Sequence, residues 1–219
     1  MNLPSKSILF LLLLAGVPAA GQYRRSHYSH GGLRYAPVAG IASASMSWEQ
    51  NRVQMDCGMR PGYMAGALLE MEIGNNVYFQ PLLLLSGKGY RFSYDITSLV
   101  KKYYSIHYLD VPFTLKWEHT VNMTDFSFFA GPYFAYALWG KVKTVRTGES
   151  PEITPLHFGS SSGDDLKKMD AGLMMGTSIQ VTSWRYMLYY SAGFFNVTPA
   201  EDNYMYTKFL CFSIAYMFN

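Results

Sequence analysis

The sequence has no apolar run of 18 or more residues after its first 21 positions. Because a transmembrane helix needs about 20 consecutive apolar residues, spanning helices are excluded from that part of the chain. Cysteine is scarce as well, since only Cys57 and Cys211 are present. One possible pair cannot build the disulfide framework of a small secreted domain, and the predicted positions, a surface loop and the middle of the last strand, argue against even that pair.

Charged residues are also few, at 15% of the chain, whereas aromatic residues reach 16% and include 18 tyrosines. Typical soluble domains contain about 25% charged residues. The 17 basic residues that remain without Lys6 nearly balance the 15 acidic ones. This balance favours neither nucleic acid nor an acidic substrate as a partner. The shortage of charge predicts that much of the outer surface does not face water.

The N-terminal residues have the features of an export signal. Lys6 supplies positive charge, the residues from Ile8 to Val17 form an apolar core, and Pro18 to Gly21 form a small-residue cleavage region. The core is shorter than the roughly 20 residues of a spanning helix, so a cleaved signal is favoured over a retained anchor. We expect residues 1–21 to be the signal peptide, residues 22–35 a periplasmic lead segment, and residues 36–219 one barrel domain.

Eight segments have the length and alternation of strands that cross a membrane. From Phe126 to Leu138 every even position is apolar or aromatic, whereas the odd positions include serine, glycine and alanine. The pattern predicts an all-β fold, an eight-stranded antiparallel up-and-down transmembrane β-barrel. The predicted strands are Ala36 to Trp48, Tyr63 to Ile73, Val77 to Leu85, Ser105 to Trp117, Phe126 to Leu138, Met169 to Val181, Tyr186 to Phe195, and Thr207 to the C-terminus.

The predicted connections alternate in length, as expected for a barrel with short periplasmic turns and long external loops. The short ones are Gly74 to Asn76, Glu118 to Asp125 and Thr182 to Arg185. The long ones are Glu49 to Arg60, Gly87 to Tyr103, Lys141 to Lys168 and Thr198 to Asn203. Both chain ends should therefore lie on the periplasmic side. Aromatic residues at strand ends are predicted to form interface belts, namely Trp48, Trp117, Trp139, Trp184, Tyr216 and Phe218.

Charged residues fall on the strand face opposite the apolar one. The lumen of an eight-stranded barrel is only wide enough for its own side chains, and charges withdrawn from water are costly unless paired. We therefore expect Glu70, Lys116 and Arg185 to pair near the periplasmic end and to close the barrel, although an ion or substrate path is the alternative. The full predicted lumen network is structural and consists of Glu70, Glu72, Asp110, Lys116, Asp170 and Arg185.

Four phrases resemble the PorT-like outer-membrane β-barrel family found among Bacteroidetes. They are Tyr108 to Lys116, Phe129 to Phe134, Asp170-Ala-Gly172 with Gly176, and Tyr190 to Asn196. The resemblance covers about Ala36 to Asn219 and implies architecture without a catalytic set. The family more usually has Glu in place of Asp110. The resemblance also implies that the barrel assembly machinery recognises the C-terminal strand. Such barrels often end on an aromatic residue, whereas here Phe218 is penultimate and Asn219 is last.

The histidines are candidates for a metal site or a catalytic site. His27 and His30 lie with Arg34 in the basic lead segment, where a solvated tail is favoured over a metal site. Ser105, His107 and Asp170 have the residue types of a catalytic triad. Such a triad is recognised by its geometry, and the sequence does not show that these residues lie close together. No catalytic residue, metal or cofactor is therefore predicted.

Three functions stay open at this point. The favoured one is an outer-membrane barrel in contact with outer-membrane lipid, with a structural or interaction role that its long loops would carry. A soluble secreted or periplasmic ligand-binding barrel would need a second face that suits water, yet that face carries Phe129, Tyr133 and Met174. The third is an outer-membrane lipid-modifying enzyme. We expect no nucleic-acid partner.

Overall fold

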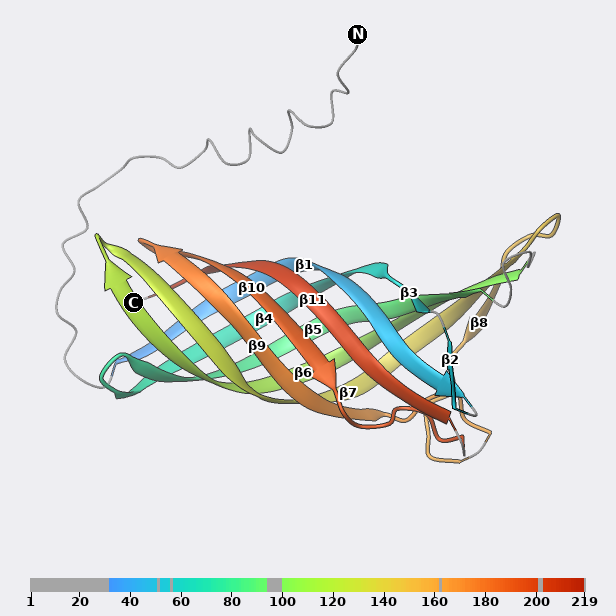
Figure 1. Cartoon of the computed structure of the whole chain (residues 1–219). Helices are drawn as coiled ribbons and strands as arrows, with labels where there is room; N and C mark the ends of the chain where they lie inside the picture. The colour runs from blue at the N-terminus through green and yellow to red at the C-terminus, as the bar shows by residue number, and fades with distance from the viewer. Residues whose placement is uncertain are drawn as a thin grey trace, which may run out of the picture.

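The computed structural model describes residues 32–50, 52–55, 57–93, 100–161, 163–200 and 203–218. Eight long antiparallel strands form a closed barrel, as predicted (Figure 1). The predicted signal peptide and residues 22–31 of the predicted lead segment lie outside the described residues. The barrel strands are β1 (Leu33–Gln50), β4 (Arg60–Gly74), β5 (Val77–Ser93), β6 (Val100–Val121), β7 (Thr124–Arg146), β9 (Met169–Val181), β10 (Trp184–Gly193) and β11 (Asn203–Tyr216).

Each barrel strand pairs with the next one along the chain, and β11 pairs with β1 to close the ring. The closing ladder runs without a break from Val38, opposite Ala215, to Gln50, opposite Asn203. Closure satisfies the backbone donors and acceptors that an open sheet edge would leave unpaired. In the described part of the chain, no helix has the length and apolarity to cross a membrane.

The connections at one end of the barrel, here called the turn end, are tight. Asn122 and Met123 link β6 to β7 and have φ angles of 48° and 63°, as a two-residue type I′ hairpin turn requires. The other tight turns contain Asn76 and Thr182, which also have positive φ. The start of β1 and the end of β11 lie at the turn end as well (Figure 1). We call the opposite end, with the longer connections, the loop end.

Alternation along the strands gives the wall two chemically different faces. On β6, side chains from Leu109 to Trp117 that point outward are apolar, whereas Asp110, Thr114 and Lys116 between them point into the lumen and are buried. The same division holds on β7, β9, β10 and β11. The apolar face is therefore on the outside, which contradicts the soluble-barrel alternative, because that alternative places the apolar face inward.

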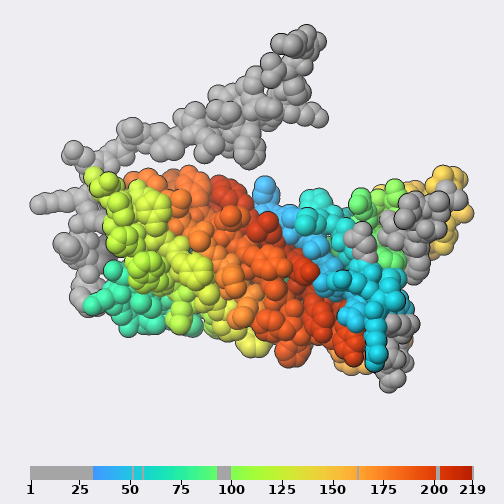
Figure 2. Space-filling model, viewed as in Figure 1, coloured from blue at the N-terminus to red at the C-terminus, as the bar shows by residue number. Residues whose placement is uncertain are grey.

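Three strands extend at the loop end by five to eight residues beyond the sequence prediction. The predicted strand from Val77 to Leu85 continues to Ser93, and those for β6 and β7 extend to Val100 and Arg146 at the loop end. Together with the short strand β8 (Glu152–Pro155), which pairs with β7, they form an outer extension that projects beyond the barrel (Figure 2). Two further short strands, β2 (Val53–Met55) and β3 (Cys57–Gly58), pair with β1 and β5 at the same end.

Two local features explain why the predicted strands for β5 and β7 ended too early. A bulge opposite His107 leaves Leu138 of β7 without a partner, and beyond it the inward positions of β7 become Gly140 and Val142. On β5, the glycines at 87 and 89 interrupt the alternation at outward positions. A Cβ on Gly87 would lie 2.5 Å from the Tyr63 ring, so the glycine makes room for a tyrosine that crosses the strand.

Candidate functional site: the charged lumen

Glu70 on β4 is the centre of a buried ion cluster at the turn end. Its carboxylate lies 2.9 Å from Nη2 of Arg34 and 2.7 Å from Nζ of Lys116, and both guanidinium Nη atoms of Arg185 donate to it. Gln180 accepts two further hydrogen bonds from Arg185, at 3.1 and 2.6 Å. Strands β1, β4, β6, β9 and β10 each supply one of these side chains. The cluster therefore joins opposite walls of the barrel.

The strand register brings these partners together. Arg34 is directly opposite Glu70 on the neighbouring strand, and Lys116 is opposite Tyr78. Nζ of Lys116 also lies 2.6 Å from Glu118 and 4.2 Å from the centre of the Tyr78 ring. The guanidinium carbon of Arg34 also lies over that ring, 4.5 Å from its centre. Three cations, two carboxylates and an aromatic ring thus fill the lumen near the turns.

The cluster is sealed from solvent, because Glu70, Lys116 and Arg185 are fully buried. Moving such ions out of water costs several kcal/mol each unless direct pairing and hydrogen bonds replace the lost hydration. Here each ion has at least two polar partners. A solute would have to break several of these contacts to pass through this layer.

A second polar cluster fills the lumen nearer the loop end. Asp110 on β6 accepts a hydrogen bond from Ser86 at 2.7 Å and pairs with Lys88 at 3.1 Å, and both partners are on β5. Asp170 on β9 accepts hydrogen bonds from Thr207 at 2.7 Å and Tyr133 at 3.2 Å. These six side chains are buried. They come from β5, β6, β7, β9 and β11, so this layer also spans the lumen.

Aromatic rings pack around the amine of Lys88. Its Nζ lies 5.0 Å from the ring centres of Tyr108 and Tyr133 and 5.6 Å from that of Phe209. A cation at such distances over aromatic faces is attracted by the ring electrons, and the attraction is stronger away from water. The rings therefore both stabilise the lysine and occupy the space around it.

The mouth at the loop end is covered by apolar side chains from two connections. Leu156 and Leu166 of the β7–β9 connection and Val197 of the β10–β11 connection are buried with the lumen core. The backbone of Lys167 donates to the carbonyl of Val197 at 2.7 Å and links the two connections. The lumen is thus filled at both ends and between them.

The structure divides the predicted lumen residues into two groups. Glu70, Lys116 and Arg185 lie in contact, whereas Asp110 and Asp170 belong to the second cluster. Glu72 is half-buried and makes no ion pair with any residue that the structure describes. The two clusters also contain side chains that the predicted network did not include, namely Arg34, Tyr78, Ser86, Lys88, Glu118, Tyr133, Gln180 and Thr207.

Two of the omitted residues, Arg34 and Lys88, would have been included if the predicted strands had been extended along the same alternation. Arg34 was assigned to the unpaired lead segment, but β1 begins at Leu33, three residues before the predicted boundary. Lys88 was assigned to a loop, although it continues the inward positions of β5 that include Ser86. In both cases a strand end was placed too close to the middle of the barrel.

The aromatic residues at the turn end form a connected exterior group. Tyr216 contacts Trp184 at a ring separation of 5.0 Å and Phe218 at 5.1 Å, and Phe218 stacks on Tyr35 at 5.2 Å. Trp117, also at this end, is half-exposed on the exterior, and Trp139 has a similar exposure at the loop end.

Trp48 differs from the prediction of an exterior belt residue. Its ring packs against that of Phe92 with a centroid distance of 4.7 Å and lies on the inner side of the wall, beside the core. The reason is phase, because Trp48 shares the inward positions of β1 with Ala44 and Met46.

The possible catalytic residues are on different faces of the wall. The ring of His107 is outside, where Nδ1 contacts the Tyr63 hydroxyl at 2.9 Å and the ring stacks on Trp139. Asp170 points into the lumen, and Ser105 is bonded to Arg60 at 2.6 Å. These residues do not form one site. The described residues also contain no group of three or more His, Cys, Asp or Glu side chains that could hold a metal ion.

Comparison with known protein families agrees with this architecture. A family model described as "Outer membrane protein beta-barrel domain" matches residues 21–198. No curated protein sequence matches the chain. Among solved structures, the chain is similar to the attachment invasion locus protein Ail of Yersinia pestis, with 12% identity, coverage of 87% of this chain and 100% of Ail, and a TM-score of 0.39.

Two other solved barrels give similar values. Neisserial surface protein A is 12% identical over 84% of this chain and 98% of its own, with a TM-score of 0.40. OprG from Pseudomonas aeruginosa is 8% identical over 87% of this chain and 98% of its own, with a TM-score of 0.46. These likenesses concern the fold alone.

Proposed function

Because this chain belongs to the outer membrane protein beta-barrel domain family, we propose that it is a closed barrel with a structural or interaction role and no catalytic activity. The observation that carries this proposal is the contact of Glu70 with cations from three other strands across the lumen. A pore or an internal active site needs free volume, and here the lumen is filled by two layers of side chains. The separation of Ser105, His107 and Asp170 supports the absence of catalysis.

The interaction would take place above the membrane. Loops and strand extensions on a rigid scaffold commonly carry binding, because the scaffold fixes their position. In this chain the extension formed by β5, β6, β7 and β8 projects beyond the barrel at the loop end (Figure 2). We assign the partner-binding role to this extension and to the adjoining connections at the loop end.

We further infer a membership in the PorT-like branch found among Bacteroidetes, export by the signal peptide of residues 1–21, and assembly through β11. The motifs from Tyr108 to Lys116 and from Tyr190 to Asn196 support the first inference. The apolar run from Ile8 to Val17 supports the second. N-terminal sequencing of the protein from outer membranes should show that the mature chain starts near Gln22. A chain that starts at Met1 would contradict the inference of a cleaved signal peptide.

The proposal is tested by conductance. The mature chain, refolded and inserted into a planar bilayer, should give no steady open current, because both lumen layers exclude water and ions. The matched variant Arg185→Ala combined with Glu70→Ala and Lys116→Ala should raise the frequency of current events. A steady open current in the unmodified protein would overturn the closed barrel and indicate a small channel.

A further inference from the structure

The outer face of the extension carries a row of cations in strand register. Arg91 on β5 is directly opposite Tyr103 on β6, and Tyr103 is directly opposite Lys143 on β7. Neighbouring strands are about 4.8 Å apart, so the two basic residues are on either side of the tyrosine, with their backbones about 10 Å apart. The arrangement places two flexible cations around one phenol.

Arg60 at the start of β4 adds a third cation in a fixed position. Its Nη1 donates to the carbonyl oxygen of Tyr104 at 2.7 Å and to Oγ of Ser105 at 2.6 Å, both on β6. To reach them the side chain crosses β5 at Gly89, where an added Cβ would lie 3.5 Å from Cδ of Arg60 and 2.3 Å from the Tyr104 carbonyl oxygen. The guanidinium lies 5.9 Å from the centre of the Tyr103 ring.

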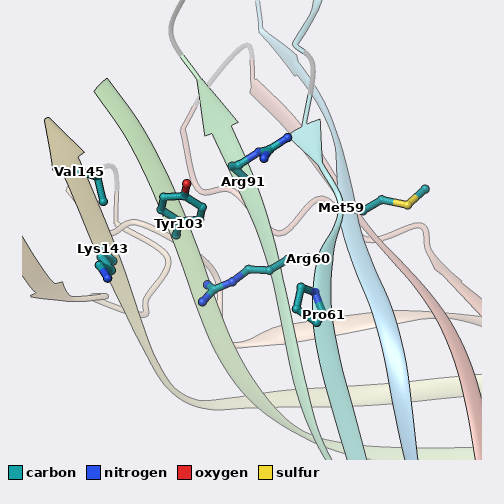
Figure 3. Close-up of a pocket in the computed structure, with 7 residues that line it drawn as sticks. All are labelled: Met59, Arg60, Pro61, Arg91, Tyr103, Lys143 and Val145. Carbon is teal, nitrogen blue, oxygen red and sulfur yellow. The ribbon is translucent and has the colours of Figure 1, made fainter. Parts of the chain in front are cut away.

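These side chains line a groove of about 450 Å³ on the outer face of β4 to β7. Figure 3 shows Arg60 extended across the strands toward Tyr103, with Arg91 above and Lys143 on the far side. The polar groups that line the groove are the three cations and the tyrosine, and the remaining lining residues are Met59, Pro61 and Val145. The groove thus combines positive charge with a neutral hydrogen-bond donor.

The positive charge of the groove has no acidic counterpart in the described part of the chain. Neither Arg60, Arg91 nor Lys143 forms an ion pair there, and Glu149 and Glu152 on the neighbouring hairpin pair with Arg146. Two further exposed cations adjoin the groove, Lys101 on β6 and Lys141 on β7. An anion is therefore the ligand that matches this surface.

The height of the groove identifies the source of the anion. Outward side chains on β6 are apolar from Leu109 to Trp117, a span of nine positions, and a tilted membrane-spanning strand has about 9 to 11 residues. His107 and Trp139 are paired at the edge of this band. Lys141 is at the next outward position of β7, and the Tyr103–Lys143 pair lies one outward position further toward the loop end. This is the level at which lipid headgroups meet the barrel.

We propose that this groove binds the phosphate of an anionic lipid headgroup in the outer leaflet. Arg91 and Lys143 pair with the phosphate oxygens, the hydroxyl of Tyr103 donates to it, and the acyl chains lie along the apolar outer face of β5, β6 and β7. The proposal rests on the outer-membrane location but not on the closed lumen. Its failure would therefore leave the conductance test unaffected.

Native mass spectrometry of the refolded mature chain in a neutral detergent, titrated with lipid A, tests the proposal. Each cation near a charged lipid surface contributes about fivefold to binding, so Arg91→Gln with Lys143→Gln should weaken lipid A binding about 25-fold. Lys208→Gln is the matched control, because this exposed lysine is on β11, across the barrel from β6. Fractionation into outer membranes and heat-dependent gel migration check that each variant folds.

The expected result is tight binding of lipid A by the unmodified chain and by Lys208→Gln, weaker binding of fully dephosphorylated lipid A, and weaker binding by the double variant. Equal binding by all variants would overturn the proposal, as would equal binding of the dephosphorylated lipid. Binding of inorganic phosphate in place of lipid A, or stronger binding of a soluble sulfated oligosaccharide, would also overturn it, because the ligand would then not be a lipid.

Discussion

The carboxylate of Glu70 accepts hydrogen bonds from Arg185, which is its most distant partner along the sequence. We expect Arg185→Ala to lower the free energy of unfolding by about 3 kcal/mol, at the lower end of the range for a broken buried pair, because Lys116 and Arg34 still compensate Glu70. Denaturant unfolding in detergent measures this loss. Glu72→Gln is the matched control and should change stability by less than about 0.5 kcal/mol, since Glu72 makes no described ion pair.

The pairing itself is tested by a double-mutant cycle. In the Arg185→Ala background, Glu70→Gln should cost less stability than it does in the unmodified protein, because the contact between Glu70 and Arg185 is already lost there. The coupling energy should be about 1 to 3 kcal/mol. Purely additive effects of the two substitutions would mean that Glu70 and Arg185 do not stabilise each other.

At the scale of elements, the two barrel ends differ in how open their connections are to protease. The β7–β8 hairpin ends in the exposed residues 147–151, whereas the turns at 75–76, 122–123 and 182–183 join the strands directly. Protease added to intact cells should therefore cut between Arg146 and Glu152 and spare the three turns. Cutting at Asn122 or Met123 in intact cells would mean that the turn end faces outward.

The position of strands in the barrel could be predicted because one face of each is continuously apolar. The segment Met169 to Val181 has the same bounds in the sequence analysis and in the structure. The outer extension could not be predicted in this way, because beyond the membrane both faces of a strand meet water, protein or headgroups. The apolar alternation there is replaced by Arg91, Tyr103 and Lys143 on one face.

The lumen network was only partly accessible from the sequence. Strand phase places Glu70, Lys116 and Arg185 on the inner face, and strand direction places them near one end. Phase does not specify which charges meet, because that depends on the stagger between strands around the ring. The separation of Asp110 and Asp170 from Glu70, and the inclusion of Lys88 with them, follow from that stagger.

For the whole molecule, an apolar exterior and a polar, filled interior are two consequences of one alternation along eight strands. The exterior is compatible with lipid, and the interior satisfies its charges internally instead of with water. In the orientation proposed above, a barrel built in this way holds its outer extension above the membrane. This arrangement suits binding above the membrane and leaves little space for passage through it.

Reaction of Cys211 is the most direct measurement of the filled lumen. This free cysteine is fully buried on the inner face of β11, between Thr207 of the second cluster and Ala215, which is paired with Arg185. In a Cys57→Ser background, a charged methanethiosulfonate reagent applied to the folded barrel in vesicles should leave Cys211 unmodified. The same reagent should modify it fully after denaturation. Modification of the folded protein at the rate of the denatured protein would contradict a lumen closed by its own side chains.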